Sequence, residues 1–512
     1  MYKRNLLDYF EHSVQQNGNK TAVIHGNQKV TFNELHDKCI HLADYLIEIT
    51  GGILHRPICV FLPKSIDVVI GDIAITYSCN FFNNLDVQTP APRLENIIQT
   101  LNPIAVITNT KYLRLLKTVD NIKCQIVNLD DFMWKNEYGH LEELNKRLEQ
   151  QIDTDPFCII NTSGSTGTPK SVLLTHRNFI DHLNWAIDTF ELDGSEILGV
   201  MSAVVFDLYV YETCLMMARG ATLVLLDKSL AAFPARLMQE TRDRHVNYIF
   251  WVPTVMVNIA NMGLLDKISL PELRLVWFAG EVFPTRQFNI WKQHYPNVVF
   301  ANLYGPCETS VCSTYYIVNK ELQDEEPIPI GKPCRNSDVL LLNEKGQLCQ
   351  EGEVGEICIR GSSLAMGYYN NPIKTKESFI QNPLNCTYPE RIYKTGDLAY
   401  RNESGDLIFK GRKDCLIKHM GNRVNLGEIE HIAVDTLKLV SNCCVVYNFE
   451  KKIITMFYES NGKSILEIRK ALATQMPRYM VPNEYIEIEQ LPRNTNGKID
   501  RHFLSDRVNQ QN

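Results

Sequence analysis

A nine-residue stretch rich in hydroxyl groups has the composition of a loop that binds a polyphosphate. It follows an apolar run at 157–160 that is typical of a buried strand, and it reads Thr162-Ser163-Gly164-Ser165-Thr166-Gly167-Thr168-Pro169-Lys170. Glycine permits positive φ and a close approach of the backbone, and successive inward N–H groups form a concave anion site. The hydroxyl groups add donors, and Lys170 adds a full positive charge. We therefore expect Thr162 to Gly167, together with Lys170, to hold phosphate oxygens.

Two other interpretations of this stretch are weaker. A P-loop, G-x-x-x-x-G-K-[ST], counted from Gly164 would need a glycine where Pro169 stands. Proline has no N–H to offer a phosphate, so this is not a Walker A loop. A flexible surface linker would rarely carry Pro-Lys so soon after a buried strand.

The stretch resembles the phosphate loop of the adenylate-forming superfamily. This superfamily includes acyl-CoA synthetases, luciferases and the adenylation domains of nonribosomal peptide synthesis. The resemblance covers nearly the whole chain and implies ATP as the ligand of the loop. One departure is Ser171, where the family usually has glycine; a hydroxymethyl group should be tolerated, although the loop could sit differently.

A second motif places a carboxylate where it could hold a metal ion. Asn302-Leu303-Tyr304-Gly305-Pro306-Cys307-Glu308-Thr309 joins a strand end to a turn, and Mg²⁺ prefers oxygen ligands beside a polyphosphate. The motif resembles the family's N-x-Y-G-P-T-E. This implies that Glu308 binds Mg²⁺ and that Tyr304 lies against adenine, with ATP contacts from Asn302, Gly305 and Cys307. Cys307 replaces a threonine whose hydroxyl contacts the α-phosphate, and a thiol is a weak donor. Taken alone, Glu308 could be a turn residue.

A third motif supplies the ribose contacts. Tyr393-Lys394-Thr395-Gly396-Asp397 resembles the family's Y-x-T-G-D, which implies that Asp397 accepts both ribose hydroxyls. Arg412, in Gly-Arg-Lys-Asp, is implied as a second ribose or phosphate contact. Asp414 matches the hinge position, where backbone torsions absorb a domain rotation.

A lysine near the end of the chain is the remaining catalytic candidate. On its own, a lysine after Asn-Gly in Asn496-Gly497-Lys498-Ile499-Asp500 would be solvent-exposed. The stretch matches the family's last motif, which implies that Lys498 neutralises charge between the substrate carboxylate and the α-phosphate. The predicted catalytic set is thus Lys498, Glu308 and Lys170.

An aspartate in an apolar setting indicates an amino-acid substrate. Phe206-Asp207-Leu208-Tyr209-Val210-Tyr211-Glu212 resembles the family's F-D-x-S-x-x-E, in which the aspartate pairs with the substrate ammonium. Such a charge-assisted contact is worth about 1.5–3 kcal/mol. The alternative is that Asp207 caps a helix, which is a common role for aspartate.

Motif alignment implies a side-chain pocket that is apolar apart from Asp207 and Lys498, with limited volume because it contains three aromatic rings. The other members are Leu208, Tyr211, Phe250, Trp277, Ala279, Leu303, Val311 and Cys312. The set resembles that of stand-alone L-prolyl-AMP ligases, whereas the segments around Asp207 and Ala279 also resemble D-alanyl carrier-protein ligases. We expect L-proline as substrate, with D-alanine or another small amino acid as the alternative.

The family's reaction has two steps. A carboxylate attacks the α-phosphate of MgATP to give an acyl-adenylate and pyrophosphate, and a thiol then captures the acyl group. Because no carrier or condensation domain follows residue 512, we expect the thiol to belong to a separate phosphopantetheinylated carrier protein rather than to coenzyme A. A luciferase-like oxygenase is disfavoured by Asp207. A catalytically inactive binding module is disfavoured by the presence of all the motif residues.

The elements that must position these residues follow an α/β pattern. Strand-like runs at 21–24, 58–62 and 221–226 alternate with helical patterns, and Thr31 with Glu34 forms a capping box. Past the Gly-Arg-Lys-Asp segment the chain becomes more charged, with helices expected at 426–439 and 464–475 and strands at 443–447 and 453–458. We predict a large multi-sheet α/β adenylation domain, 1–413, and a smaller mobile α+β domain, 414–512.

Composition excludes several other classes of protein. A net charge of -7 without a basic stripe argues against nucleic acid as a partner. The N-terminus lacks the apolar run of a secretory signal, and no stretch of eighteen apolar residues could span a membrane. Fifteen cysteines without C-x-x-C pairs are typical of reduced thiols, so we expect a cytoplasmic protein.

Overall fold

The computed structural model describes most of the 512-residue chain. The described residues are 3–119, 122–132, 139–162, 169–413, 416–492 and 499–509. The predicted residues Ser163, Gly164, Ser165, Thr166, Gly167, Asp414 and Lys498 lie outside these ranges.

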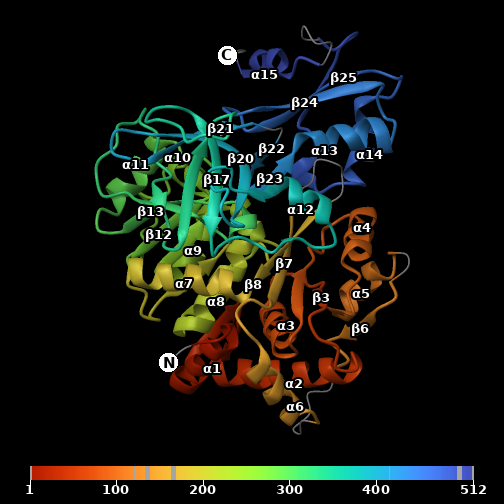
Figure 1. Ribbon diagram of the computed structural model, residues 1–512, viewed down its shortest axis with the longest axis vertical. Coiled ribbons are helices and arrows are strands. Elements are labelled where there is room, and N and C mark those ends of the chain that lie inside the picture. The colour runs from red at the N-terminus through yellow and green to blue at the C-terminus, as the bar shows by residue number, and fades with distance from the viewer. Residues whose placement is uncertain are drawn as a thin grey trace.

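A seven-stranded sheet is formed mainly by the first third of the chain (Figure 1). Its strands, in spatial order, are β18 (Gly367–Tyr368), β8 (Lys170–Thr175), β7 (Pro156–Thr162), β4 (Phe81–Asn84), β3 (Pro57–Val60), β5 (Ala105–Thr108) and β6 (Gln125–Asn128). Strands β7, β4, β3, β5 and β6 are parallel, whereas β8 and β18 extend the sheet in antiparallel register. Parallel strands need crossover helices, as the alternating pattern of the sequence predicts.

A second, nine-stranded sheet carries the residues of the predicted substrate pocket. Its strands, in spatial order, are β15 (Lys332–Pro333), β14 (Thr314–Ile317), β13 (Val299–Tyr304), β12 (Leu275–Ala279), β11 (Tyr248–Trp251), β9 (Ile197–Val200), β10 (Thr222–Leu225), β1 (Thr21–His25) and β2 (Gln28–Thr31). The six central strands, from β13 to β1, are parallel. Ala279 and Tyr304 are the last residues of neighbouring strands β12 and β13, so both lie at the same sheet edge.

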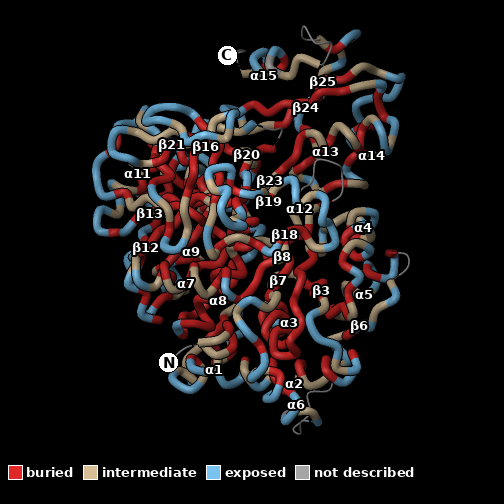
Figure 2. Tube along the Cα trace, in the orientation of Figure 1, coloured by how far each residue is buried: buried red, intermediate tan, exposed pale blue. Residues whose placement is uncertain are grey.

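Buried helices pack with the two sheets. Helices α3 (Ile66–Tyr77) and α8 (Asp207–Arg219) are buried along almost their whole length, as Figure 2 shows. They share one hydrophobic core with residues of both sheets and of α1 (Leu6–Asn17), α2 (Phe32–Ile49) and α7 (His176–Phe190). The other helices of this part are α4 (Ala91–Leu101), α5 (Thr110–Leu116), α6 (Leu141–Gln150), α9 (Pro234–Asp243), α10 (Pro253–Asn261), α11 (Thr285–His294) and α12 (Pro372–Ser378).

A five-stranded antiparallel sheet completes the large part of the chain. It contains β16 (Ser337–Leu342), β17 (Gly355–Gly361), β20 (Arg391–Arg401), β19 (Phe379–Gln381) and β21 (Leu407–Arg412). Asp397 on β20 pairs directly with Arg412 on β21, so strand pairing alone brings these two predicted ATP contacts together.

The residues after 415 form separate small sheets at one end of the molecule (Figure 1). A hairpin of β22 (Leu416–His419) and β23 (Asn422–Asn425) leads into α13 (Leu426–His431). A three-stranded sheet of β24 (Asn442–Asn448), β25 (Ile453–Glu459) and β26 (Glu484–Glu487) packs with α14 (Ile465–Ala473) and α15 (Arg501–Asn509). Two hydrophobic clusters are drawn only from residues beyond 416.

Several predicted elements are confirmed, and one is wrong in length. Thr31 and Glu34 form the capping box of α2. The helix predicted over 426–439 instead leaves the α-helical path after His431, continues as a π-helical turn and ends at Lys438, which has φ 48°. A backbone bond from Leu439 N to Ala433 O closes this end.

The cysteines of the described residues are all free thiols. Within the same ranges, no helix combines the length and apolarity needed to cross a bilayer.

Candidate active site

A cavity of about 260 Å³ lies where the large part of the chain meets the β22–β23 hairpin. Segments distant in sequence line it: the end of β7, the start of α8, the ends of β12 and β13, and the β20–β21 pair. Ligands of α/β proteins bind at the carboxyl ends of parallel strands. Predicted site residues that line the cavity are Thr162, Asp207, Leu208, Phe250, Ala279, Gly305, Cys307, Val311, Asp397 and Arg412.

Asp397 is at the centre of a hydrogen-bond network beside the cavity. The Tyr304 hydroxyl donates to Asp397 Oδ2 at 2.5 Å, and Arg412 Nη1 donates to Oδ1. Arg412 Nη2 also donates to Thr395 O at 2.9 Å, which fixes the guanidinium. The carboxylate predicted to bind ribose is therefore already oriented by two donors.

Glu308 does not itself line the cavity, but it follows Cys307, which does, and it is fully buried in the 3₁₀ turn η2 (Cys307–Thr309). Its Oε1 accepts from the Tyr368 hydroxyl at 2.9 Å, and Arg423 Nη1 lies 2.8 Å from Oε2 and 3.1 Å from Oε1. Burial alone would raise the pKa of Glu308, but Arg423 and Lys170 lower that pKa to about 2. Lys170, the first residue of β8, has its Nζ 5.0 Å from the Tyr368 ring centroid.

Glu308 has the chemistry of a magnesium ligand. Mg²⁺ is usually held by one or two carboxylates together with substrate phosphates, and it keeps several waters. A fully buried, ionised carboxylate also requires a cationic partner. Arg423 and Lys170 supply that positive charge in the structure. No cluster of three or more candidate metal ligands occurs within the described residues, so a metal here would rely on Glu308 and substrate phosphates.

Asp207 reaches the cavity from the first position of α8. The N-cap of that helix is Phe206, without a side-chain cap, so the interpretation of Asp207 as a helix cap is wrong. Its Oδ2 accepts from Val311 N at 3.3 Å. Burial raises the pKa of Asp207 to about 6.

The loop that presents Val311 has an unusual backbone. Val311 has φ 64°, a left-handed conformation that is strained for a β-branched residue, and Ser310 has φ 57°. Gly305 allows this loop to fold back, because a Cβ there would lie 2.4 Å from Cys312 Cα. The strain aims a backbone N–H at the carboxylate of Asp207.

The predicted side-chain pocket divides into two groups. Leu208, Phe250, Ala279 and Val311 line the cavity, whereas Tyr211, Trp277, Leu303 and Cys312 are buried and do not line it. The Tyr211 and Trp277 rings stack with centroids 5.5 Å apart, and Phe250 meets Trp277 edge-on at 5.4 Å. Tyr211 and Trp277 therefore pack behind Phe250 and do not stand as separate walls of the cavity.

Two departures from the family motifs have distinct surroundings. Ser171 Oγ donates to Asn161 Oδ1 at 2.8 Å across the β7–β8 pair, so the added hydroxymethyl group has its own partner. Burial raises the pKa of Cys307, which stays a neutral thiol at the cavity wall. Asn302 is not part of the cavity, because its Nδ2 donates to Pro329 O at 2.8 Å.

Sequence reasoning missed two cations on the β22–β23 hairpin. Lys418 and Arg423 both line the cavity, and Lys418 Nζ lies 5.7 Å from the Tyr304 ring centroid. The alternation of Lys418 with apolar Ile417 indicates a strand with one polar face. Only the packing of the hairpin shows that this polar face meets the site.

A second cavity of about 870 Å³ shares its walls with the first. Residues common to both are Arg93, Asn161, Ala203, Phe206, Lys228, Ala231, Val252, Val255, Met420, Asn422 and Tyr479. It is also lined by Arg478 and Pro477, so its walls come from both sides of the junction.

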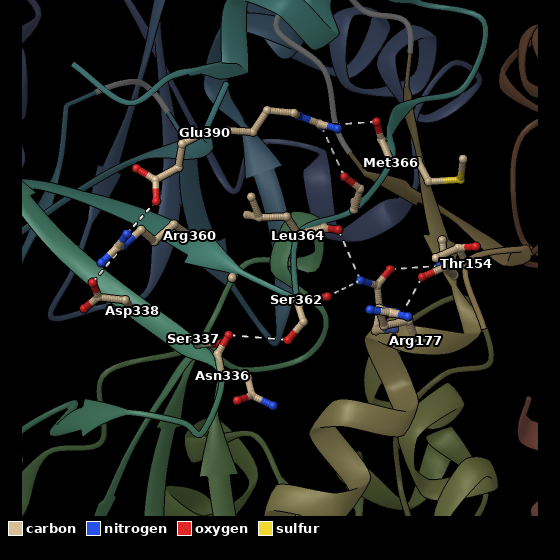
Figure 3. Close-up of a pocket in the computed structure, with 15 residues that line it drawn as sticks. Thr154, Arg177, Asn336, Ser337, Asp338, Arg360, Ser362, Leu364, Met366 and Glu390 are labelled. Atoms are coloured by element: carbon tan, nitrogen blue, oxygen red, sulfur yellow. Dashed lines mark hydrogen bonds and ion pairs between the residues drawn. The ribbon is translucent and has the colours of Figure 1, made fainter. Parts of the chain in front are cut away.

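A third cavity, of about 720 Å³, lies between β16, β17 and the start of α7 (Figure 3). Its charged side chains are engaged by neighbours: Arg360 with Asp338 and Glu390, and Arg391 with the carbonyls of Ala365 and Met366. None of the predicted site residues that the structure describes lines it.

The chain matches the family described as AMP-binding enzyme over residues 10–369. It is 30% identical to zwittermicin A synthase ZmaJ of Bacillus cereus over 97% of this chain and 94% of that protein. It is 31% identical to delta-poly-L-ornithine synthetase of Acinetobacter baumannii, of which it spans 36%, and it spans 14% of tyrocidine synthase 2 of Brevibacillus parabrevis.

Two solved structures share the fold. The Vibrio cholerae adenylation domain AlmE, in complex with glycyl-adenosine-5'-phosphate, gives a TM-score of 0.83 at 21% identity and 98% coverage of both chains. Holo-PA1221, an NRPS protein containing adenylation and PCP domains, gives 0.81 at 21% identity, covering 98% of this chain and 84% of that one. The chain therefore belongs to the AMP-binding, adenylate-forming enzymes, and it has the fold of these solved adenylation domains.

Proposed function

We propose that the protein activates a small apolar amino acid, with L-proline as the leading candidate, and transfers it to the thiol of a separate carrier protein. The observation that carries this proposal is the Asp207 carboxylate, which lines a cavity shared with Asp397 and Arg412 and is flanked by Leu208, Phe250 and Ala279. A carboxylate in apolar surroundings can recognise an ammonium group.

The first step joins substrate and nucleotide. A carboxylate oxygen of the amino acid bonds to the α-phosphorus of ATP, and the bond from that phosphorus to pyrophosphate breaks. Mg²⁺, when bound at Glu308, neutralises phosphate charge. Lys170 and Lys498 add positive charge, while Asp397 and Arg412 orient the ribose. Catalysis then depends on positioning and charge stabilisation.

The second step requires a path for a long thiol. The thiol sulfur bonds to the acyl carbon, the bond to AMP oxygen breaks, and the thiol proton is lost to solvent. The cavity of about 870 Å³ that opens into the site suits a phosphopantetheine arm. Lys228 and Arg478 along it provide positive charge for the phosphate of the arm, whereas Arg93 is paired with the buried Glu428. The free cysteines support a cytoplasmic setting.

L-Proline fits the small apolar end of the site better than alanine does. Its two additional ring methylenes, at about 0.8 kcal/mol each, are worth about 1.6 kcal/mol, or roughly fifteenfold in kcat/KM. D-Alanine is the alternative, because the rings packed beneath Phe250 limit the depth of the pocket. Glycine belongs in the same comparison, since AlmE was solved with glycyl-adenosine-5'-phosphate.

The deciding experiment is amino-acid-dependent ATP–pyrophosphate exchange with L-proline, D-alanine, L-alanine, glycine, glutamate and lysine. We expect the highest kcat/KM for L-proline. Preference for glutamate or lysine would overturn the apolar assignment, and preference for D-alanine or glycine would overturn proline alone. Loading of holo but not apo carrier protein, measured by mass, tests the acceptor.

The division of the chain at 413/414 is a further part of the proposal. The clusters drawn only from residues beyond 416 support it, and Asp414 would be the pivot. Asp414→Pro, which fixes φ near about -65°, should slow thioester transfer more than pyrophosphate exchange. Equal loss of both half-reactions would contradict the hinge.

A further inference from the structure

The helix that carries Asp207 begins without a side-chain cap. The N-cap of α8 is Phe206, and Asp207 at the first helical position lines the cavity. The first four N–H groups of an α-helix have no partner within the helix, so an uncapped start can shift unless other contacts hold it. The position of the Asp207 carboxylate therefore depends on what contacts the segment around the start of α8.

Two buried polar residues from another part of the chain make these contacts. Asp72 lies in α3 and Asn84 ends β4, and they are 2% and 3% exposed. Asp72 Oδ2 accepts from the Tyr209 hydroxyl at 3.1 Å. Asn84 Nδ2 donates to Val204 O at 3.2 Å. Tyr209 is two residues beyond Asp207 and Val204 is three residues before it, so the chain is held on both sides of the carboxylate.

The two polar residues are also joined to each other. Asn84 Nδ2 donates to Asp72 Oδ2 at 3.0 Å, although the side chains around Asp72 include Ile73, Phe82 and Val210. A polar pair in such surroundings gives little net stability, since apolar groups of the same shape could be equally stable. A buried hydrogen-bonded network instead specifies one arrangement of the elements that it joins. Here the elements are α3, β4 and the start of α8.

We propose that Asp72, together with Asn84, is a positioning residue of the reaction: it holds the start of α8 so that the Asp207 carboxylate lies where the ammonium group of the amino acid binds. This inference rests on the proposed function, in which Asp207 binds that ammonium. Asp72 acts through Tyr209, because it lines neither the cavity of about 260 Å³ nor the one of about 870 Å³. Its loss should therefore weaken binding of the amino acid and leave ATP binding unchanged.

Asp72 fills this role as a neutral acid. Burial raises the pKa of Asp72 to about 8, because the hydrogen bonds from Asn84 and Tyr209 lower that pKa less than burial raises it. Both bonds go to Oδ2, and Oδ1 has no hydrogen-bond partner in the part of the chain that the structure describes, so a negative charge would be poorly stabilised. Burial also raises the pKa of the titratable groups that face Asp72, which keeps them neutral at pH 7: Tyr209, Cys39, Cys158 and Cys214. Asparagine, which is uncharged and has the same shape, should therefore replace Asp72 at pH 7.

The first test removes one hydroxyl group from each of two buried tyrosines. Tyr209→Phe deletes the donor to Asp72. In ATP–pyrophosphate exchange with the amino acid that the panel prefers, the KM of the amino acid should rise about two- to tenfold, the range for loss of one hydrogen bond. The KM of ATP should stay within twofold of wild type.

Tyr77→Phe is the matched control. Tyr77 is fully buried on the same helix α3, but its hydroxyl donates to Glu11 on α1. This variant should leave both KM values within twofold of wild type. A wild-type KM of the amino acid in Tyr209→Phe would overturn the proposal. Equal increases in the two variants would also overturn it, because they would show general damage to the core.

The second test changes Asp72 itself and is made at pH 7. Asp72→Asn can still accept both hydrogen bonds, so the KM of the amino acid should stay within twofold of wild type. Asp72→Ala leaves two buried donors without an acceptor, and that KM should rise at least as much as in Tyr209→Phe. An unchanged KM in Asp72→Ala, or a KM in Asp72→Asn as high as in Asp72→Ala, would overturn the proposal. If Asp72→Ala does not fold, the two tyrosine variants still decide.

Asp207→Ala separates this inference from the proposed function. If Asp207→Ala raises the KM of the amino acid and Tyr209→Phe does not, the positioning role alone is wrong. If Asp207→Ala also leaves that KM unchanged, the error lies in the proposed role of Asp207.

Discussion

Two arginine–carboxylate pairs in this molecule are chemically alike but differ in origin. Arg360 and Asp338 are partners in the β16–β17 register, and their side chains are 39% and 45% exposed. Arg423 and Glu308 are 115 positions apart and belong to segments on opposite sides of the predicted domain boundary. Exposed pairs are worth about 0–1 kcal/mol, whereas breaking a buried pair costs about 3–5 kcal/mol. The pair formed across the junction is therefore the one that can couple chemistry to domain position.

Lys498→Ala should lower activity more than the other substitutions. Lys498 lies outside the described residues, but like Arg423 it belongs to the part of the chain beyond the boundary. Loss of a preorganised electrostatic contact lowers rates by about 10²–10³. We expect pyrophosphate exchange to fall by that factor while ATP binding, measured by calorimetry, survives. Exchange within threefold of wild type would remove Lys498 from the mechanism.

Asp207→Ala should have the second-largest effect on activity. It removes a charge-assisted contact worth about 1.5–3 kcal/mol, so the KM of the amino acid should rise about 10- to 150-fold. The KM of ATP should stay constant, which separates substrate recognition from damage to the site. Asp207→Asn, of nearly equal volume, is the control for packing. If Asn restores the wild-type KM, the charge is not what binds the substrate.

The contrast between local and non-local pairs also explains what the sequence could predict. Asp397 and Arg412 were predicted as ATP contacts by resemblance to two family motifs, and they meet because β20 and β21, which are close in sequence, pair with each other. The contact of Arg423 with Glu308 depends on how separate parts pack, so no local pattern contains it. Tyr211 was predicted as a pocket residue by motif alignment and lies one turn beyond Asp207 on α8, but the stacking of its ring on Trp277 depends on the neighbouring strand.

The pH dependence should give a smaller but more specific effect. Burial raises the pKa of Asp207 to about 6, so its carboxylate becomes neutral as the pH falls below that value. Since only the ionised form pairs with an ammonium group, kcat/KM for the amino acid should fall about tenfold between pH 7 and pH 5. Asp207→Asn, which cannot titrate, should lose this inflection. An inflection that persists in this variant would assign it to another group.

Arg360→Met should have the smallest effect on activity, and it tests the exposed pair in the way that the other substitutions test the site. Arg360 bridges Asp338 and Glu390 at the third cavity, where each pair is formed within the five-stranded sheet or the segment next to it. Methionine keeps the aliphatic contacts of arginine while it removes the charge. Because exposed pairs are worth about 0–1 kcal/mol, we expect a small decrease in the thermal midpoint and exchange activity within twofold of wild type. Raising the salt concentration should lower the wild-type midpoint toward that of the variant, since screening acts on exposed charges. A fivefold loss of activity would mean that a locally formed, exposed pair also controls the site. Burial across the junction would then no longer distinguish the two regions.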